Sequence, residues 1–416
     1  MPESSVTETE SRLEPEVAFF VPGWPLAEAP NGIVSYVAAL REGLDLCGVG
    51  SSVFVGRGGK TGEANVVPLS VRLSLGDRIE RFVRTRLRVP DRLAPFAALL
   101  RKEVGARAPR GLRLFEMEES FGLVDRIRVP GVARVARLHG PWFVNGPALG
   151  VVEDAAFRER VSAEGRAISG ADGVSAPSVD VLARVRDYYQ LELPRAEVIP
   201  NPGPSVDRAA TWRPDVARPK QVLFVGRFDR HKGGDLVVQA FARLASEDPE
   251  VELVFAGPDR GLTEGDSKIS LDDYISRHVP SALRPRLHVL GSTDPVRIAK
   301  LRREAQLVIV PSRYENFPMA VVEACAYGCP MVGAATGGIA EIISHERNGL
   351  LFKMGDVDEL TAAIRRLLDR PAEAAAFAEA ARQDYELRFK PETLAARTLD
   401  FYRSIPRCGD IGQRPK

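Results

Sequence analysis

Two glutamates separated by seven residues, Glu315 and Glu323, are the strongest chemical signal in this chain. A short apolar strand is predicted over 306–310 and a helix over 319–327, so the pair brackets a strand–loop–helix junction. Ionised carboxylates accept hydrogen bonds and repel phosphate, so each glutamate suits the hydroxyl groups of a sugar. The spacing therefore predicts a site for a hydroxyl-rich ligand.

The start of the predicted helix adds an anion site between the two carboxylates. First-turn amides of a helix have no partner within the helix and carry the positive end of its dipole. Here that turn follows Asn316 and Phe317, and Pro318 suits the first helical position. A ligand that presents a sugar, a diphosphate and a ribose in that order fits this arrangement.

A second signal is a glycine-bounded loop over 226–234, which begins at Gly226 and carries Arg227, Arg230 and Lys232. It follows a buried-type strand, and ligands of open parallel sheets bind beyond the carboxyl ends of the strands. An arginine fork and a lysine ammonium can together hold a diphosphate while its negative charge grows. The structural alternatives are a solvated basic loop here and a surface loop before an amphipathic helix at the glutamates, but both signals together favour a ligand site.

Apolar runs alternate with helical patterns along both halves of the chain, which predicts an α/β fold with two doubly wound parallel sheets. The runs lie at 17–21, 52–55, 112–115, 132–138, 173–176 and 198–200 in the first half, and at 222–225, 253–256, 287–290, 307–310, 331–334 and 350–352 in the second.

The length of 416 residues fits two domains of about 200 residues each. A proline-rich and glycine-rich stretch after residue 199 predicts the boundary. We expect a disordered tail over 1–15, a first domain over 16–205, a second over 206–390, and a terminal helical segment over 391–416.

Composition narrows the class of protein. Lys and Arg total 57 against 56 Asp and Glu, a net charge of +1, so no global argument for nucleic-acid binding exists. The four cysteines lack metal-binding spacing, and no apolar run approaches the roughly 20 residues of a membrane span. With a polar, acidic start rather than a signal-like one, the sequence predicts a cytoplasmic protein.

The glutamate pair and the cationic loop together resemble the signature of the nucleotide-sugar glycosyltransferases of family 4, which have the two-domain GT-B architecture. The resemblance implies that Glu315 contacts the sugar of the donor and Glu323 the ribose of its nucleotide, while Arg227 and Lys232 hold the diphosphate. Family members commonly have Phe-Gly after the first glutamate, whereas this chain has Asn-Phe-Pro, which removes one backbone donor at Pro318.

The same resemblance implies that the first domain binds the acceptor, that the second binds the donor, and that the terminal helix crosses back to pack on the first domain. It also implies the reaction. This reaction is the transfer of a hexosyl unit from a nucleoside-diphosphate sugar to a hydroxyl group of a glycan or lipid-linked acceptor, with retention of anomeric configuration. The expected loop has no DxD cluster, so neither a metal nor another cofactor is expected. A nucleotide-sugar epimerase, a glycoside phosphorylase and a non-catalytic nucleotide-sugar-binding subunit stay open as alternatives.

Four further positions follow from the resemblance. His139, at the end of the fourth apolar run, matches a histidine near the donor sugar, Gly32 a glycine that approaches the diphosphate, and Gly291 and Ser292 the place of the nucleobase. Without this resemblance, the favoured interpretation of His139 is a structural histidine, and that of Gly32 is a simple turn before a helix.

Two charged regions of the first half admit two interpretations each. Glu116, Glu118 and Glu119 follow a predicted strand, where a solvated loop is favoured over contact with the acceptor. The segment 72–113 has twelve basic and four acidic residues among scattered apolar ones. It would either bind an anionic membrane surface peripherally or, as the favoured interpretation, solvate helices that pack on the sheet.

Overall fold

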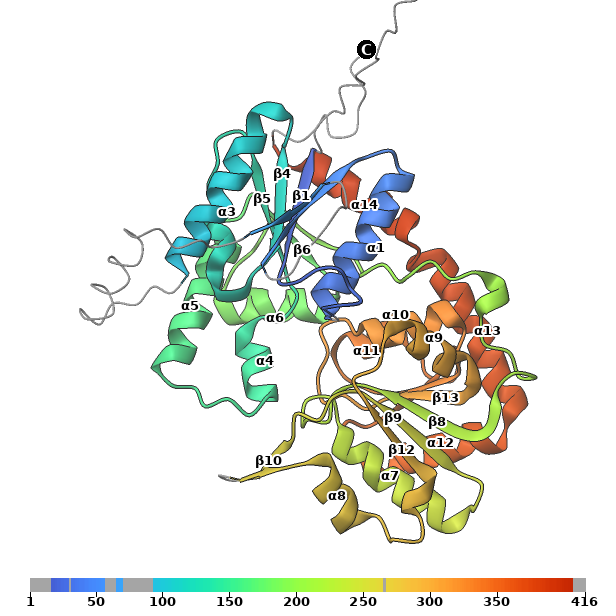
Figure 1. The fold of residues 1–416 in the computed structure, drawn as a ribbon. Helices are drawn as coiled ribbons and strands as arrows, with labels where there is room; N and C mark the ends of the chain where they lie inside the picture. The colour runs from blue at the N-terminus through green and yellow to red at the C-terminus, as the bar shows by residue number, and fades with distance from the viewer. Residues whose placement is uncertain (1–15, 30, 57–64, 70–92, 265–266, 407–416) are drawn as a thin grey trace, which may run out of the picture.

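The computed structural model describes residues 16–29, 31–56, 65–69, 93–264 and 267–406. Two α/β domains follow one another along the chain, and Figure 1 shows the first above the second. The predicted tail over 1–15 and the first half of the basic segment, residues 72–92, lie outside the described residues.

The first domain is built on a seven-stranded sheet of order β3-β2-β1-β4-β5-β6-β7, in which every pairing is parallel. Its strands are β1 (Val17–Val21), β2 (Ser51–Val55), β3 (Val66–Pro68), β4 (Leu114–Glu118), β5 (Ala133–Arg137), β6 (Gly173–Ala176) and β7 (Ala196–Val198). The α-helices between them are α1 (Gly32–Leu46), α3 (Ala94–Arg107), α4 (Trp142–Ala148), α5 (Ala155–Ser169) and α6 (Val179–Tyr189).

The second domain has a six-stranded parallel sheet of order β12-β9-β8-β13-β14-β15 and an antiparallel pair, β10 with β11. Its strands are β8 (Arg218–Val225), β9 (Glu252–Ala256), β10 (Leu262–Glu264), β11 (Ser267–Ile269), β12 (Leu287–Gly291), β13 (Ala305–Val310), β14 (Met331–Ala334) and β15 (Leu350–Phe352). Its α-helices are α7 (Gly234–Glu247), α8 (Leu271–His278), α9 (Pro295–Glu304), α10 (Met319–Tyr327), α11 (Gly337–Ile342), α12 (Val357–Asp369) and α13 (Pro371–Arg388).

These sheets confirm the predicted fold class, and each predicted apolar run overlaps a strand. β1 and β13 are buried along their whole length, as expected for strands covered by helices on both faces. Strands β3, β10 and β11 were not predicted, because β3 has only two valines before a proline and β10 and β11 are largely polar.

The last helix, α14 (Pro391–Ser404), returns to the first domain. It packs so closely on α1 that a Cβ atom on Gly43 would come within 2.2 Å of the Pro391 carbonyl oxygen. At its other end, the hydroxyl of Tyr402 donates to Glu116 of β4 over 3.0 Å. This helix therefore ties the end of the chain to the core of the first domain.

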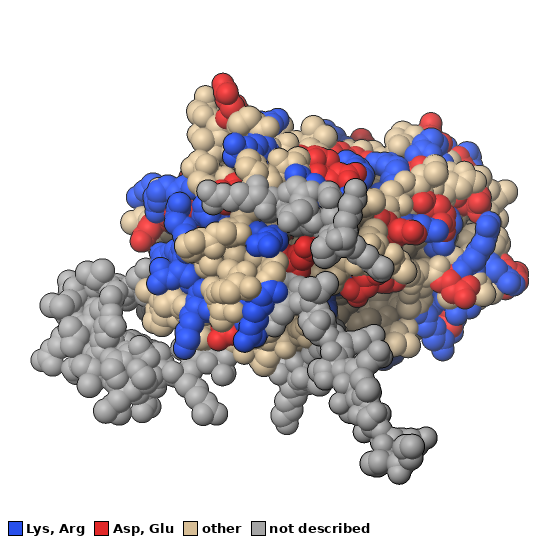
Figure 2. All heavy atoms as spheres, turned by 90° about the horizontal axis from the view of Figure 1, so that it is seen from above, with Lys and Arg blue, Asp and Glu red and all other residues tan. Residues whose placement is uncertain are grey.

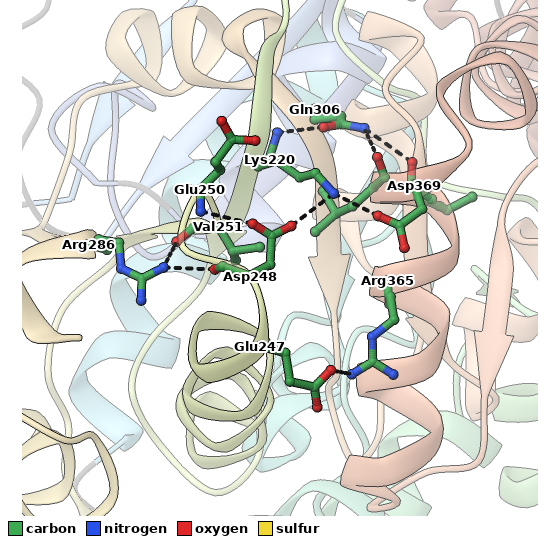
Figure 3. Close-up of polar contacts among 11 residues, drawn as sticks. Lys220, Glu247, Asp248, Glu250, Val251, Arg286, Gln306, Arg365 and Asp369 are labelled. Carbon is green, nitrogen blue, oxygen red and sulfur yellow. Dashed lines mark hydrogen bonds and ion pairs between the residues drawn. The ribbon is translucent and has the colours of Figure 1, made fainter. Parts of the chain in front are cut away.

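A polar network closes the amino ends of the second sheet, opposite the ends where a ligand is expected (Figure 3). The ammonium of Lys220 on β8 contacts Asp248 over 3.0 Å and Asp369 over 2.7 Å, and its backbone amide donates to Gln306 of β13 over 2.6 Å. Its members are paired with one another, so we assign this network a structural role.

The described part of the basic segment includes α3. Leu100 and Val104 of this helix are buried in the first-domain core, and Phe96 and Leu99 pack against that core. Arg101 and Lys102 are exposed, and basic side chains are frequent over the first domain in Figure 2, at the left of the view. In this part, the apolar residues are therefore used in folding.

Candidate active site

The cationic loop joins β8 to α7 and is organised by Asp229. Its carboxylate accepts a hydrogen bond from Nε of Arg227 over 2.8 Å and another from the backbone amide of Lys232 over 2.7 Å. Gly233 then adopts a left-handed conformation, and a Cβ atom there would lie 2.2 Å from the Pro311 carbonyl oxygen. The loop is thus held against the end of the neighbouring strand, β13.

Lys232 and Glu315 meet between these two strand ends, where Nζ lies 2.5 Å from Oε1. Burial raises the pKa of Glu315, but the charge of Lys232 and hydrogen bonds from Lys232 and Ser312 outweigh burial and leave the pKa below its ordinary value. Glu315 is therefore ionised at neutral pH, although it is only 9% exposed. The structure places a cation and an anion side by side.

His231 is a member of this cluster that sequence reasoning missed. Its side chain is buried, and neither ring nitrogen has a hydrogen-bond partner in the described part of the chain. Burial lowers its pKa, with opposing contributions from Glu315 and Lys232. A neutral imidazole thus lies beside the ion pair.

The glutamate loop rests on α11. The Gly338 amide donates to the Glu315 carbonyl over 2.8 Å, and a Cβ atom on Gly338 would lie 2.2 Å from the Asn316 carbonyl oxygen. At Gly337, where φ is +45°, a Cβ atom would approach the Glu315 carbonyl to 2.3 Å. Any side chain at these glycines would push the loop that carries Glu315.

The first domain brings His139 to the same place. The side-chain amide of Asn316 donates to the His139 carbonyl over 2.7 Å, which joins the two domains directly. Burial and the charge of Arg137 hold the pKa of His139 well below its ordinary value, so this imidazole is also neutral. His139, Asn316, Glu315 and Lys232 therefore form one connected group.

The three glutamates at the end of β4 are buried, so the prediction of a solvated loop was wrong. Glu119 accepts hydrogen bonds from the amides of His139 over 2.9 Å and Gly140 over 2.7 Å. Glu116 accepts from the hydroxyls of Tyr36, Ser175 and Tyr402. The local sequence gave no indication that these glutamates are buried, because their hydrogen-bond partners come from elements distant in the sequence.

The remaining predicted donor-site residues have varied surroundings. Glu323 is paired with Arg302 through Oε2. The ring of Phe317 packs against Phe389 in the core, with ring centroids 5.9 Å apart. Pro318 is the N-cap of α10 rather than its first residue.

The four other predicted positions are three glycines, which offer only backbone groups, and an exposed serine. Gly226 donates its amide to Ala256, and Gly291, with φ of +64°, accepts from the Gly257 amide over 2.8 Å. Gly32 opens α1, and no atom lies within 4 Å of a Cβ built there. Ser292 is exposed after β12. None of these contacts includes a side chain of the Lys232 and Glu315 group.

Among the residues that the structure describes, no three His, Cys, Asp or Glu side chains are grouped so as to hold a metal ion. In the same residues, no helix has the length and apolar character needed to cross a bilayer.

Known structures share this architecture. Sucrose-phosphate synthase from Thermosynechococcus elongatus superimposes with a TM-score of 0.70 at 20% identity, over 93% of this chain and 98% of that one. HepE from Anabaena in complex with UDP and glucose gives a TM-score of 0.66 at 20% identity, over 93% of this chain and 99% of that one. The fold is therefore GT-B, with two Rossmann-like domains.

Residues 211–384 match the family model described as glycosyl transferases group 1. Glycogen synthase from Mycobacterium tuberculosis is 31% identical over 272 residues, which are 64% of this chain and 62% of that relative. The alignment thus spans less than two thirds of the relative's length. These matches place residues 211–384 in the group 1 glycosyl transferase family, within a chain of GT-B fold.

Proposed function

We propose that this chain is a retaining glycosyltransferase that moves a hexosyl unit from a nucleoside-diphosphate sugar to a hydroxyl group of a glycan or lipid-linked acceptor. The observation that carries the proposal is the pair of Lys232 and Glu315 at adjacent strand ends. One partner suits phosphate and the other suits sugar hydroxyls. HepE, which shares the fold, was solved with UDP and glucose, and this supports a nucleotide-sugar donor.

Donor cleavage creates positive character at the anomeric carbon and negative charge on the departing diphosphate. Lys232 and Arg227 stabilise that negative charge, because both are cations of the loop between β8 and α7. Glu315, ionised in the structure, accepts hydrogen bonds from the hydroxyls of the sugar. The neutral ring of His139 adds no cation beside the anomeric carbon.

The nucleotide is assigned to the second domain. Glu323 uses Oε2 for Arg302, and we assign its Oε1 to the ribose hydroxyls. The backbone around Gly291 and Ser292 receives the base. Asn316, Phe317 and Pro318 supply backbone rather than charged groups beside the diphosphate, and Gly32 offers an open approach from the first domain.

Retention follows if the acceptor attacks from the face that the diphosphate leaves, with the departing phosphate taking the acceptor's proton. The two cations of the loop balance the diphosphate charge, so we infer that turnover needs no metal and that EDTA leaves the rate unchanged.

Incubation with a panel of nucleotide sugars, with and without lipid extract, tests the proposal. Transfer or slow donor hydrolysis, with the product anomer assigned by NMR, supports it. Phosphate-dependent cleavage or an epimerised donor would instead indicate a phosphorylase or an epimerase. Binding without turnover would indicate a nucleotide-sugar-binding subunit.

Peripheral membrane contact through the 72–113 segment stays a prediction. Sedimentation with acidic liposomes at low and high salt tests it, because binding through basic residues weakens as salt rises. Absence of salt-sensitive binding would leave the segment with a folding role only.

A further inference from the structure

A carboxylate of the second domain caps a helix of the first. Glu341 on α11 accepts hydrogen bonds from the amides of Val179 over 2.9 Å and Asp180 over 2.8 Å. These amides open α6, where the helix dipole favours a negative charge. Figure 1 shows α6 and α11 side by side where the two domains meet.

A second contact joins α6 to the loop between β13 and α10. The hydroxyl of Tyr314 donates to Oδ2 of Asp180 over 2.9 Å, and the same oxygen accepts from Nε of Arg184 over 2.8 Å. The guanidinium of Arg184 also lies over the Tyr314 ring, 5.2 Å from its centroid. Tyr314 is only 7% exposed, so its hydroxyl is held away from solvent.

Both contacts lead directly to the residue proposed to hold the donor sugar. Tyr314 precedes Glu315 in the chain. Glu341 is carried by α11, whose Gly338 amide donates to the Glu315 carbonyl over 2.8 Å. A shift of α6 relative to the second domain must therefore move the Glu315 loop or break one of these bonds.

We propose that Tyr314 and Glu341, with Asp180 and the start of α6, form an interdomain clasp that positions the Glu315 loop against the first domain. The proposal rests on the transferase function proposed above and adds positioning residues to it. In the proposed reaction the second domain holds the donor and the first holds the acceptor, and transfer needs the two within a fraction of an ångström of a reactive arrangement. Hydrogen bonds to charged groups are strong enough to fix that arrangement.

Hydrogen exchange tests the contact without any substrate. In Glu341→Ala, the amides at 179 and 180 lose their acceptor, so we expect them to exchange at least about tenfold faster, since hydrogen bonds to charged groups are the strong class. Tyr188→Phe, at an exposed tyrosine of the same helix, is the control and leaves exchange unchanged. Unchanged exchange in Glu341→Ala would overturn the clasp.

Kinetics then test the positioning role. In Tyr314→Phe and Glu341→Gln, we expect hydrolysis of UDP-glucose to fall roughly tenfold in kcat, while UDP affinity, measured by calorimetry, changes less than about threefold, as for loss of a positioning contact. Thermal melting confirms that each variant is folded. Wild-type kcat in both variants would overturn positioning. If the wild type uses no nucleotide sugar, the proposed function fails, and the exchange measurement still decides the clasp.

Discussion

The buried carboxyl groups of the two domains have opposite surroundings. In the second domain, Glu315 lies beside Lys232, and its pKa is lowered. In the first domain, burial raises the pKa of Glu118 to about 7 and, together with the charge of Glu164, that of Glu119 to about 8. The second domain thus keeps a charged pair at its strand ends, whereas the first keeps carboxyls that favour their neutral form.

This difference in surroundings indicates different roles for Glu315 and Glu119. The charged pair can exchange its internal contact for phosphate and hydroxyl groups of a ligand. Glu119 instead bonds to the amides of His139 and Gly140, so it fixes backbone next to the site. In the proposed reaction, the second domain supplies charge, whereas Glu119 of the first domain holds the backbone beside the site.

The largest expected effect is on the charged pair. Lys232→Ala should lower turnover on the order of 10²-fold to 10³-fold, the usual loss when one group that stabilises developing charge is removed. Arg230→Ala is the matched control, because Arg230 lies in the same loop with an exposed side chain. Steady-state kinetics of both variants measure the difference. Near-normal turnover in Lys232→Ala would remove the proposed role of charge.

A smaller effect is expected where the glutamate loop is supported. The new Cβ atom in Gly338→Ala would lie 2.2 Å from the Asn316 carbonyl oxygen, so the loop must shift. Overpacking of this kind costs about 1 to 3 kcal/mol, and we expect weaker nucleotide binding as well. Gly105→Ala, in a helix with open space around the new atom, serves as control. Urea unfolding and calorimetry measure the two effects, and equal behaviour of the variants would contradict the packing argument.

The smallest expected effect is on the pH dependence of stability, which Glu119 of the first domain and Glu315 of the second change in opposite directions. The raised pKa of Glu119 contributes stability that is present below its ordinary value of 4.5 and is lost as pH rises toward about 8. The lowered pKa of Glu315 acts in the other direction, because its stability is lost as pH falls below the ordinary value.

Glu119→Gln cannot ionise, so its urea midpoint should fall less between about pH 5 and 8 than that of the wild type. We expect the slopes of unfolding free energy against pH to differ by about 1 kcal/mol per pH unit, since one pKa unit corresponds to about 1.4 kcal/mol. Glu153→Gln, at an exposed position, should follow the wild-type slope. Parallel slopes for all three proteins would show that Glu119 is ionised in the folded state.

Much of the fold was predictable because buried parallel strands are continuous apolar runs. The runs at 17–21, 173–176, 331–334 and 350–352 match β1, β6, β14 and β15 without any shift. The strands β3, β10 and β11 were missed because they contain no continuous apolar run: β3 ends in a proline, and β10 and β11 are largely polar.

The site was predictable where residue type alone determines the chemistry, as for a lysine and a glutamate at strand ends. The ion pair of Glu323 with Arg302 was not predictable, since Arg302 approaches from another helix, α9. Asp229 had a local signal that was missed, because an aspartate three residues before Lys232 can accept its amide in a turn. The burial of Glu116, Glu118 and Glu119 depends on tertiary packing, which local patterns do not contain.

Titration of nucleoside diphosphates into the wild type and into Lys232→Ala is the most direct test of the central claim, that the charged pair is a diphosphate-sugar site. We expect one site in the wild type for at least one of UDP, ADP and GDP, and roughly tenfold or weaker binding in the variant, as for loss of a charged hydrogen bond. Absence of binding in the wild type, or equal affinity in both proteins, would contradict the account.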